Sequence, residues 1–481
     1  MKPYFRPFLI MLVVLSASLV WSQTSTSDAP PSGSSGSSGI PGWGQAAGSA
    51  QQSSGSSQPS SGSGQPSDGP QPAFTYPEER PKLALLDEVT AHSFVTLGMG
   101  ASAAWDSNAG SFSYQPYSLG YLILNPSIQL RQTRPTFTWY AGAFGALTTS
   151  NSSRYYSTAN PSASAGFLWQ LNNHWQLNVN DNYLYTSDPF RQYLVYSSAP
   201  TYNQPNPTVY TPLATVQSNY GTVTLTYQIN ARDSIVFGGS ESFRRYLHTT
   251  STVYDLTTYG GYAAYQHLFS ARLSAGAAYS FNSLDSSHGQ SRSGVNMIQA
   301  YMTYQLGRHM SVGGWIGPEY TTTKNLIPIL CTPYGCFIEE KHFNSWDTAF
   351  GGNFSWRGEQ NAFIGSFLKS VSDGGLVLGV VQLYQVNAGY IRQLNPRWNL
   401  AVGVQYGNNT GTSTKAHVQH LDSLTANLNL TRQLTPSLSA GVQYLYINEN
   451  QKNIIGAAAP HWTDNRFQIS LQYYWGHSLG R

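Results

Sequence analysis

The sequence predicts an all-β protein: a transmembrane antiparallel up-and-down β-barrel of about 18 strands, preceded by a disordered N-terminal segment. Three observations support this prediction. A polar turn carrying Gln or Asn, followed at once by a strand of alternating polar and apolar residues, recurs along the chain. Charged residues make up only 10% of the 481 residues, whereas aromatic residues reach 14%. Beyond the N-terminus, no apolar run of roughly 18 residues could form a membrane-spanning helix.

The N-terminus has the pattern of a secretory signal. Lys2 and Arg6 precede an apolar run over residues 8–20, after which polar residues return. The run is too short to span a membrane, and small residues at its end suit cleavage. We therefore expect residues 1–22 to be a signal peptide and the mature chain to be exported.

The next segments have too few apolar residues to fold alone. Residues 23–75 are mostly Ser, Gly, Gln and Pro, which predicts a disordered periplasmic linker. Residues 76–92 form a short pre-barrel segment with room for one or two helical turns. Strands are expected over 93–475, and residues 476–481 form a C-terminal tail.

The strands alternate with a period of two. In 423–431 and 467–475, one face is apolar and the other consists of Ser, Thr, Asn, Gln and Tyr. A soluble β-sandwich alternates too, but its outer face would carry Lys and Glu. The nearly uncharged polar face favours the wet interior of a barrel whose apolar face contacts lipid.

Counting hairpins gives the strand number and the topology. Bacterial barrels have short periplasmic turns and longer outer loops. About eight short turns and nine longer connections predict 16 to 18 strands, with both termini in the periplasm. The short turns are expected at 132–135, 172–174, 230–233, 269–271, 306–309, 357–360, 394–397 and 434–436. The longer connections are expected at 107–117, 150–160, 188–215, 248–256, 285–292, 322–342, 372–377, 408–419 and 449–462.

Three places depart from the regular pattern. Residues 119–133 and 376–392 alternate irregularly. In the strand over 175–185, Asp181 shares a face with Trp175 and other apolar residues, and an acid facing lipid is costly. We expect a bulge or a change of register there.

Cys331 and Cys336 are the only cysteines of the chain. In an exported protein, a disulfide that closes a small ring within a loop is the expected state. Pro333 and Gly335 favour the tight turn that such a ring needs. A metal-binding or redox pair is the alternative, but further ligands are lacking. We predict neither a metal nor a cofactor.

Charged residues inside a barrel tune its selectivity. Arg244 and Arg245 are adjacent, so one of them must point inward, and Glu241 lies nearby. No ring of one charge sign is present, which favours uncharged polar solutes. The net charge of +3 is too small to imply a nucleic-acid partner.

Aromatic residues at strand ends usually anchor a barrel at the membrane interfaces. The functional alternative is an inner track on which sugars stack, with Tyr140, Phe144 and Tyr474 as candidates by parity. A barrel enzyme is a further alternative, because His309 and Ser311 share a face. No Asn partner accompanies them, so we predict no enzyme and no catalytic residue.

The last strand ends in alternating apolar and aromatic residues. This pattern resembles the assembly signal of outer-membrane barrels, and the resemblance implies recognition by the barrel-assembly machinery. The signal usually closes the chain, whereas six residues follow it here. Its residues are Phe467, Ile469, Leu471, Tyr473 and Trp475.

The turn–strand phrases at 394–406 and 434–444 resemble those of outer-membrane β-barrel porins of Gram-negative bacteria, including barrels associated with exopolysaccharide export. The resemblance covers about residues 93–475 and is generic. It implies an outer-membrane channel for passive diffusion of small polar, weakly charged solutes. A barrel that assists exopolysaccharide export and a structural or adhesive surface barrel remain alternatives. The expected partners are the lipid bilayer and small solutes or saccharides, and a homo-oligomer is left open.

Overall fold

The computed structural model describes residues 92–109, 118–150, 158–187, 215–247, 255–286, 291–332, 335–373, 380–411, 420–452 and 461–478. The predicted signal peptide and linker lie outside these residues, as does the pre-barrel segment apart from His92. In the part of the chain that the structure describes, no helix is long and apolar enough to cross a membrane.

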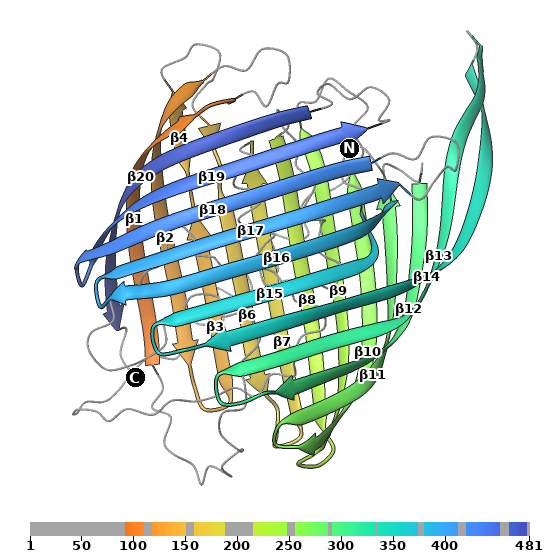
Figure 1. Ribbon diagram of the computed structural model, residues 1–481, viewed down its shortest axis with the longest axis horizontal. Helices are drawn as coiled ribbons and strands as arrows, with labels where there is room; N and C mark the ends of the chain where they lie inside the picture. The colour runs from red at the N-terminus through yellow and green to blue at the C-terminus, as the bar shows by residue number, and fades with distance from the viewer. Residues whose placement is uncertain are drawn as a thin grey trace, which may run out of the picture. The chain divides into compact units, whose positions relative to one another are not determined.

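The described residues form one antiparallel sheet of twenty strand segments (Figure 1). β3 and β4 pair with β2 in one register on either side of a local break, and Asn160 N donates across the break to Ala146 O at 2.8 Å. β3–β4 and β5–β6 therefore each count as one strand, which gives a closed barrel of 18 strands. The segments are β1 (His92–Asp106), β2 (Leu119–Thr133), β3 (Phe137–Phe144), β4 (Leu147–Ser150), β5 (Thr158–Ala159), β6 (Ser162–Gln170), β7 (Trp175–Thr186), β8 (Thr215–Gln228), β9 (Asp233–Leu247), β10 (Leu256–Ser270), β11 (Leu273–Ser286), β12 (Ser291–Gln305), β13 (Met310–Thr332), β14 (Gly335–Arg357), β15 (Asn361–Asp373), β16 (Val380–Asn395), β17 (Trp398–Gly411), β18 (His420–Thr435), β19 (Leu438–Lys452) and β20 (His461–Ser478).

The sheet closes because β1 pairs with the last strand as well as with β2. Ala101 lies opposite Leu124 on β2 and opposite Leu471 on β20. Each strand otherwise pairs with its neighbours in the chain, so the predicted up-and-down barrel is confirmed. Closure leaves most of the strands paired on both sides, so most backbone groups are satisfied within the wall, as a membrane requires.

An Asn side chain caps three of the short turns. Asn395 Oδ1 accepts hydrogen bonds from Arg397 N at 2.9 Å and Trp398 N at 3.1 Å, and Asn172 and Asn230 do the same. This arrangement is the Asx-turn, in which the side chain replaces a backbone acceptor. We call this end of the barrel the turn end and the opposite end the loop end. The short turns lie at 134–136, 171–174, 229–232, 271–272, 306–309, 358–360, 396–397 and 436–437.

The expected long connection at 322–342 is not a loop. β13 continues to Thr332 and β14 begins at Gly335, and the two pair as a ribbon beyond the neighbouring strands (Figure 1). The polar sequence predicts a loop because a ribbon outside the apolar band needs no lipid-facing side. Lys324 Nζ contacts Glu340 Oε2 at 2.7 Å in this ribbon. The register sets the Cα atoms of Cys331 and Cys336 opposite each other, while their side chains lie outside the described residues. The disulfide stays a prediction.

The bulge expected at Asp181 is also wrong. β7 pairs with both neighbours in unbroken register, and Asp181 lies opposite Ala165 and Gly221 on the outer face. The acid is accommodated because Asn219 Nδ2, on the same face, donates to its Oδ1 at 2.7 Å. A side-chain partner therefore replaces the expected distortion of the backbone.

The two irregular segments are ordinary strands where they are described. β2 pairs with β1 over its whole length, and β16 pairs with β15 from Val380 to Arg392. The pattern of β2 is irregular because its inner face also carries apolar residues, Leu119 and Ile123, which are buried. Pro126, which has no N–H to donate, lies within the strand. Its carbonyl still accepts from Gly145 N at 2.9 Å.

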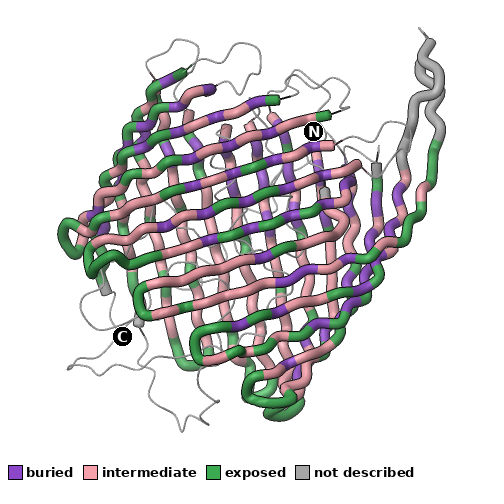
Figure 2. The backbone as a smooth tube through the Cα atoms, in the orientation of Figure 1, coloured by how far each residue is buried: buried purple, intermediate pink, exposed green. Residues whose placement is uncertain are grey.

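The barrel wall has one apolar face and one polar face. Buried and exposed residues alternate along the strands in Figure 2, and neighbours such as Ile298 and Gln299 are 60% and 2% exposed. The exposed large side chains are mostly apolar, as a lipid-facing surface requires. Aromatic pairs mark both ends of this band: Trp175 and Tyr227 have ring centroids 4.5 Å apart near the turn end. Tyr320 and Trp346 are 4.8 Å apart near the loop end.

Candidate functional site

The inner face of the wall is the candidate site, and most of it is built from uncharged polar side chains. On β16 to β18, Gln385, Asn387, Gln405 and Asn427 all point inward and are buried. Gln385 Nε2 donates to Asn387 Oδ1 at 3.2 Å. Amides both donate and accept hydrogen bonds, so this wall can exchange partners with polar solutes of either kind.

A charged cluster lies at the loop end where β1 closes against β20. Arg466 Nη2 donates to Asp106 Oδ2 at 3.0 Å. The backbone N of Asn108 donates to Asp106 Oδ1 at 3.0 Å and to Asp464 Oδ1 at 3.1 Å. Nearby on β19, Glu449 is buried on the same inner face. We call Asp106, Glu449, Asp464 and Arg466 the seam cluster; it holds three carboxylates and one guanidinium.

The seam cluster was absent from the residues singled out in the sequence. The signal that would have found it is parity: Asp464 and Arg466 continue the inner face of 467–475 towards the loop end. Asp106 has no such signal, because only the pairing of β1 with β20 brings it opposite Arg466.

Of the three predicted charges on β9, only Arg244 faces inward. It is buried, and its Nη1 donates to Tyr246 Oη at 3.4 Å. Glu241 and Arg245 lie on the outer face with Phe243, and the Arg245 guanidinium lies 5.3 Å from the centroid of that ring. The period of two separates neighbours in sequence onto opposite faces, so Glu241 and Arg245 do not line the interior.

The predicted inner aromatics Tyr140, Phe144 and Tyr474 are on the inner face, but they lie against the wall. A Cβ added to Gly166 would come within 2.8 Å of the Tyr140 ring, and one added to Gly98 within 3.0 Å of the Tyr474 ring. In both pairs the glycine is the direct cross-strand partner of the tyrosine. The Phe144 ring lies similarly close to the glycine two residues earlier on its own strand.

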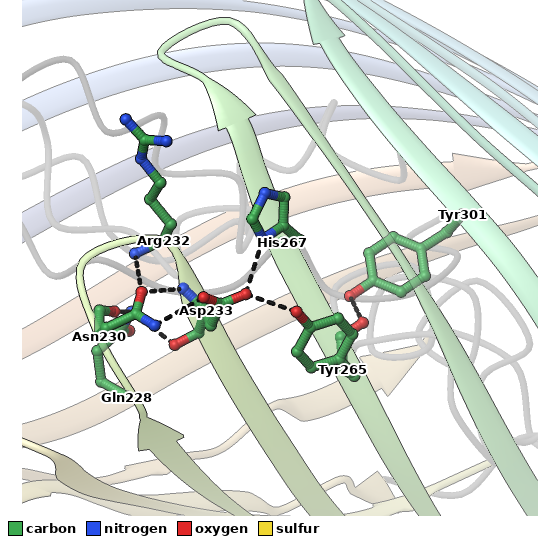
Figure 3. A network of polar contacts seen from close by, with 7 residues as sticks. All are labelled: Gln228, Asn230, Arg232, Asp233, Tyr265, His267 and Tyr301. Carbon is green, nitrogen blue, oxygen red and sulfur yellow. Dashed lines mark hydrogen bonds and ion pairs between the residues drawn. The ribbon is translucent and has the colours of Figure 1, made fainter.

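A polar network joins three strands on the outer rim at the turn end (Figure 3). Asp233 Oδ1 accepts from Tyr265 Oη at 2.5 Å and contacts His267 Nδ1 at 2.7 Å, and Asp233 Oδ2 accepts from Asn230 Nδ2 at 2.7 Å. These hydrogen bonds, Tyr265's first, lower the pKa of the Asp233 carboxyl from its ordinary 3.8 to about 2. On the inner face, Tyr301 Oη donates to the carbonyl of Tyr265 at 3.0 Å. The network fixes the β8–β9 turn to β10.

The five residues of the predicted assembly signal point outward and are exposed on β20. β20 runs on to Ser478 and pairs with both β1 and β19. The strand that carries the pattern is thus the strand that closes the barrel. The residues are Phe467, Ile469, Leu471, Tyr473 and Trp475.

Reactive groups are sparse on the described wall. Ser311 faces inward and its Oγ lies 3.0 Å from Ser355 Oγ, whereas His309 belongs to the turn before β13. Among the described residues, no group of three or more His, Cys, Asp and Glu side chains could hold a metal ion.

No family model and no curated protein matches the chain. Among solved structures, OpdL of Pseudomonas aeruginosa is 12% identical with a TM-score of 0.39, over 80% of this chain and 99% of that one. OccAB4 of Acinetobacter baumannii is 12% identical with a TM-score of 0.42, over 80% and 98%. The ferric-catecholate import receptor Fiu of E. coli K12 is 11% identical with a TM-score of 0.41, over 79% and 81%. These likenesses are too distant to bear on what passes through this barrel.

Proposed function

We propose that the protein is an outer-membrane channel for passive diffusion of small polar, weakly charged solutes. The observation that supports this most is the closed 18-strand wall with an apolar outer face and an inner face of amides and hydroxyls. A barrel of roughly 16 to 18 strands encloses an aqueous channel. The short turns and both termini face the periplasm in this proposal.

The seam cluster gives the channel a weak preference for cations. Asp106 and Asp464 both accept from Asn108 N, and two carboxylates this close share a proton, so the pair balances Arg466 and Glu449 supplies the excess of negative charge on this part of the inner wall. Charges at a polar pore lining raise the local concentration of counter-ions. Because the inner face of β16 to β18 carries uncharged amides, neutral polar solutes pass as well.

Conductance of the refolded barrel in a planar bilayer tests the proposal. We expect discrete steps and, under a salt gradient, a reversal potential that favours cations. Glu449→Gln removes one carboxylate of the seam cluster and should shift that potential towards zero. Glu241→Gln, on the outer face, is the matched control and should leave it unchanged. Absence of steps from a barrel that folds, judged by heat-modifiable mobility on a gel, would contradict the proposal.

A second candidate, passage of saccharides, is favoured by Tyr140. Its ring is 38% exposed on the inner face, and its hydroxyl donates to Asn180 Oδ1 at 3.0 Å. An aromatic face beside an amide offers both stacking and hydrogen bonding to a sugar. Oligosaccharides should then interrupt the conductance, and Tyr140→Ala should weaken this block. Equal block in both proteins would leave the general channel as the better proposal.

A further inference from the structure

The barrel wall separates between β14 and β15 towards the loop end. Their ladder runs from Arg357 opposite Ala362 only as far as Phe350 opposite Lys369. Beyond it, the described residues of β14 pair with β13 alone, and the end of β15 pairs with β16 alone, up to Asp373. β13 stays paired with β12 up to Asn325 opposite Ser291, so the wall opens on one side only, between β14 and β15.

Side chains hold the separated part together. Asp347 on β14 accepts from Lys369 Nζ at 2.7 Å and from Gln382 Nε2, so it joins β15 and β16. Glu319 on β13 accepts from the backbone N of Val371 at 3.1 Å and 3.2 Å through its two oxygens. We call these five residues the clasp. Where the ladder would offer a carbonyl to the Val371 amide, a carboxylate takes its place.

Apolar groups flank the clasp on both sides. Towards the interior, Leu284, Val295 and Val380 form a buried cluster against which Val371 packs. Leu284 and Val295 come from β11 and β12, on the other side of β13 and β14 from Val371 and Val380.

On the lipid side, aromatic rings surround the clasp. The Lys369 ammonium lies 6.0 Å from the Phe350 ring centroid and 5.6 Å from that of Tyr384. Trp346, four residues before Phe350 on β14, is 72% exposed on the outer face. A path through the wall at this point would run from apolar side chains past paired charges to aromatic rings at the level of the loop-end girdle.

We propose that the clasp closes a lateral portal, through which amphipathic solutes pass between the interior and the membrane. A polar head group would take the place of one clasp partner, and an apolar tail would follow the Leu284–Val295–Val380 cluster and the outer rings. Hydrogen bonds of side chains open locally more readily than a continuous backbone ladder. The proposal rests on the channel function and adds a second exit to it.

Reversible cross-linking tests the portal. The background protein carries Cys331→Ser and Cys336→Ser. In it, Asp347→Cys and Lys369→Cys are joined by a short bifunctional methanethiosulfonate, which locks β14 to β15. Uptake of a radiolabelled medium-chain fatty acid by cells carrying the barrel should fall at least roughly fivefold, and a reductant should restore it. Phe367→Cys with Val386→Cys, an outward pair within the intact β15–β16 ladder, is the matched control and should not alter uptake.

The axial conductance of the same proteins separates the two proposals. Locking should leave bilayer conductance unchanged while it stops fatty-acid uptake. Unchanged uptake after complete cross-linking would overturn the portal and leave the channel standing, whereas absent conductance in every variant would overturn the channel. As an independent readout, Glu319→Leu should speed hydrogen exchange of the Val371 amide several-fold relative to Phe363; equal exchange would contradict the clasp.

Discussion

The Tyr262 ring lies directly over Gly238, its cross-strand partner on β9. A Cβ built on Gly238 would fall 1.9 Å from Cε1 of that ring, which no real side chain tolerates. The same pairing of an inward aromatic with an opposite glycine recurs on other strands. The shared geometry keeps large rings flat on the wall and out of the interior. The further pairs are Tyr140 with Gly166, Tyr301 with Gly276, Trp315 with Gly351 and Tyr474 with Gly98.

Gly238→Ala should therefore destabilise the barrel and narrow its interior. The methyl group forces the Tyr262 ring off the wall, and overpacking of this kind costs roughly 1–3 kcal/mol. Denaturant unfolding followed by Trp fluorescence measures the loss, and bilayer conductance should fall in step. Gly239→Ala is the control, because a Cβ there meets only the Gly260 carbonyl at 3.7 Å. Equal effects of the two substitutions would contradict the packing argument.

The strand number and the topology were predictable because the turns repeat. Asn172, Asn230 and Asn395 cap their turns with the same side-chain geometry, so these hairpins leave a recognisable signal in the sequence. The ribbon over 322–342 leaves none, because a solvated hairpin and a polar loop have similar compositions. Asp181 misled for a different reason: its partner Asn219 is distant in sequence, and only the register of β7 and β8 brings the two together.

Removing one partner of the buried Asp106–Arg466 pair should lower the free energy of unfolding strongly, whereas replacing both partners by apolar residues should lower it little. Asp106→Ala leaves a buried guanidinium without its carboxylate, which typically costs about 3–5 kcal/mol. Arg466 also lies 5.5 Å from the Tyr121 ring centroid, so Arg466→Met can keep part of this packing. The double variant with Asp106→Leu should recover most of the lost unfolding free energy. A double-mutant cycle with little coupling would show that the pair does not join β1 to β20.

Asp233 should make the barrel sensitive to acid. Its pKa is lowered from 3.8 to about 2 in the folded chain, so the ionised carboxylate stabilises the fold above about pH 4. This contribution is lost as the pH falls from about 4 to about 2, because the unfolded chain takes up the proton first. Tyr265→Phe removes the largest cause and should return the pKa towards 3.8, measured by NMR titration of the Asp233 carboxyl. An unchanged midpoint would rule out the Tyr265 hydrogen bond as the cause.

The candidate site was less predictable than the fold. Parity along one strand correctly gives the side on which Tyr474 or Arg466 points, but it does not say where the ring or the charge then lies. Tyr474 lies flat because Gly98 is opposite, and Arg466 finds Asp106 because the first and last strands meet. Both depend on the closing register, which no local pattern contains. The clasp at β14–β15 depends likewise on where a ladder ends.

The outward aromatic of β20 should matter for assembly, and its inward neighbour should not. Trp475 is exposed on the outer face, whereas Tyr474 is buried on the inner face one residue away. If the assembly machinery reads the outer face of the last strand, Trp475→Ala should lower the amount of barrel that reaches the outer membrane several-fold. Tyr474→Ala removes a ring of similar size and should affect unfolding more than delivery.

The measurement is membrane fractionation with heat-modifiable mobility, beside in vitro refolding into lipid vesicles. Refolding separates delivery from stability, because no assembly machinery is present there. A Trp475→Ala protein that refolds normally yet fails to reach the membrane supports the assembly signal; equal losses for both variants would assign them to stability alone.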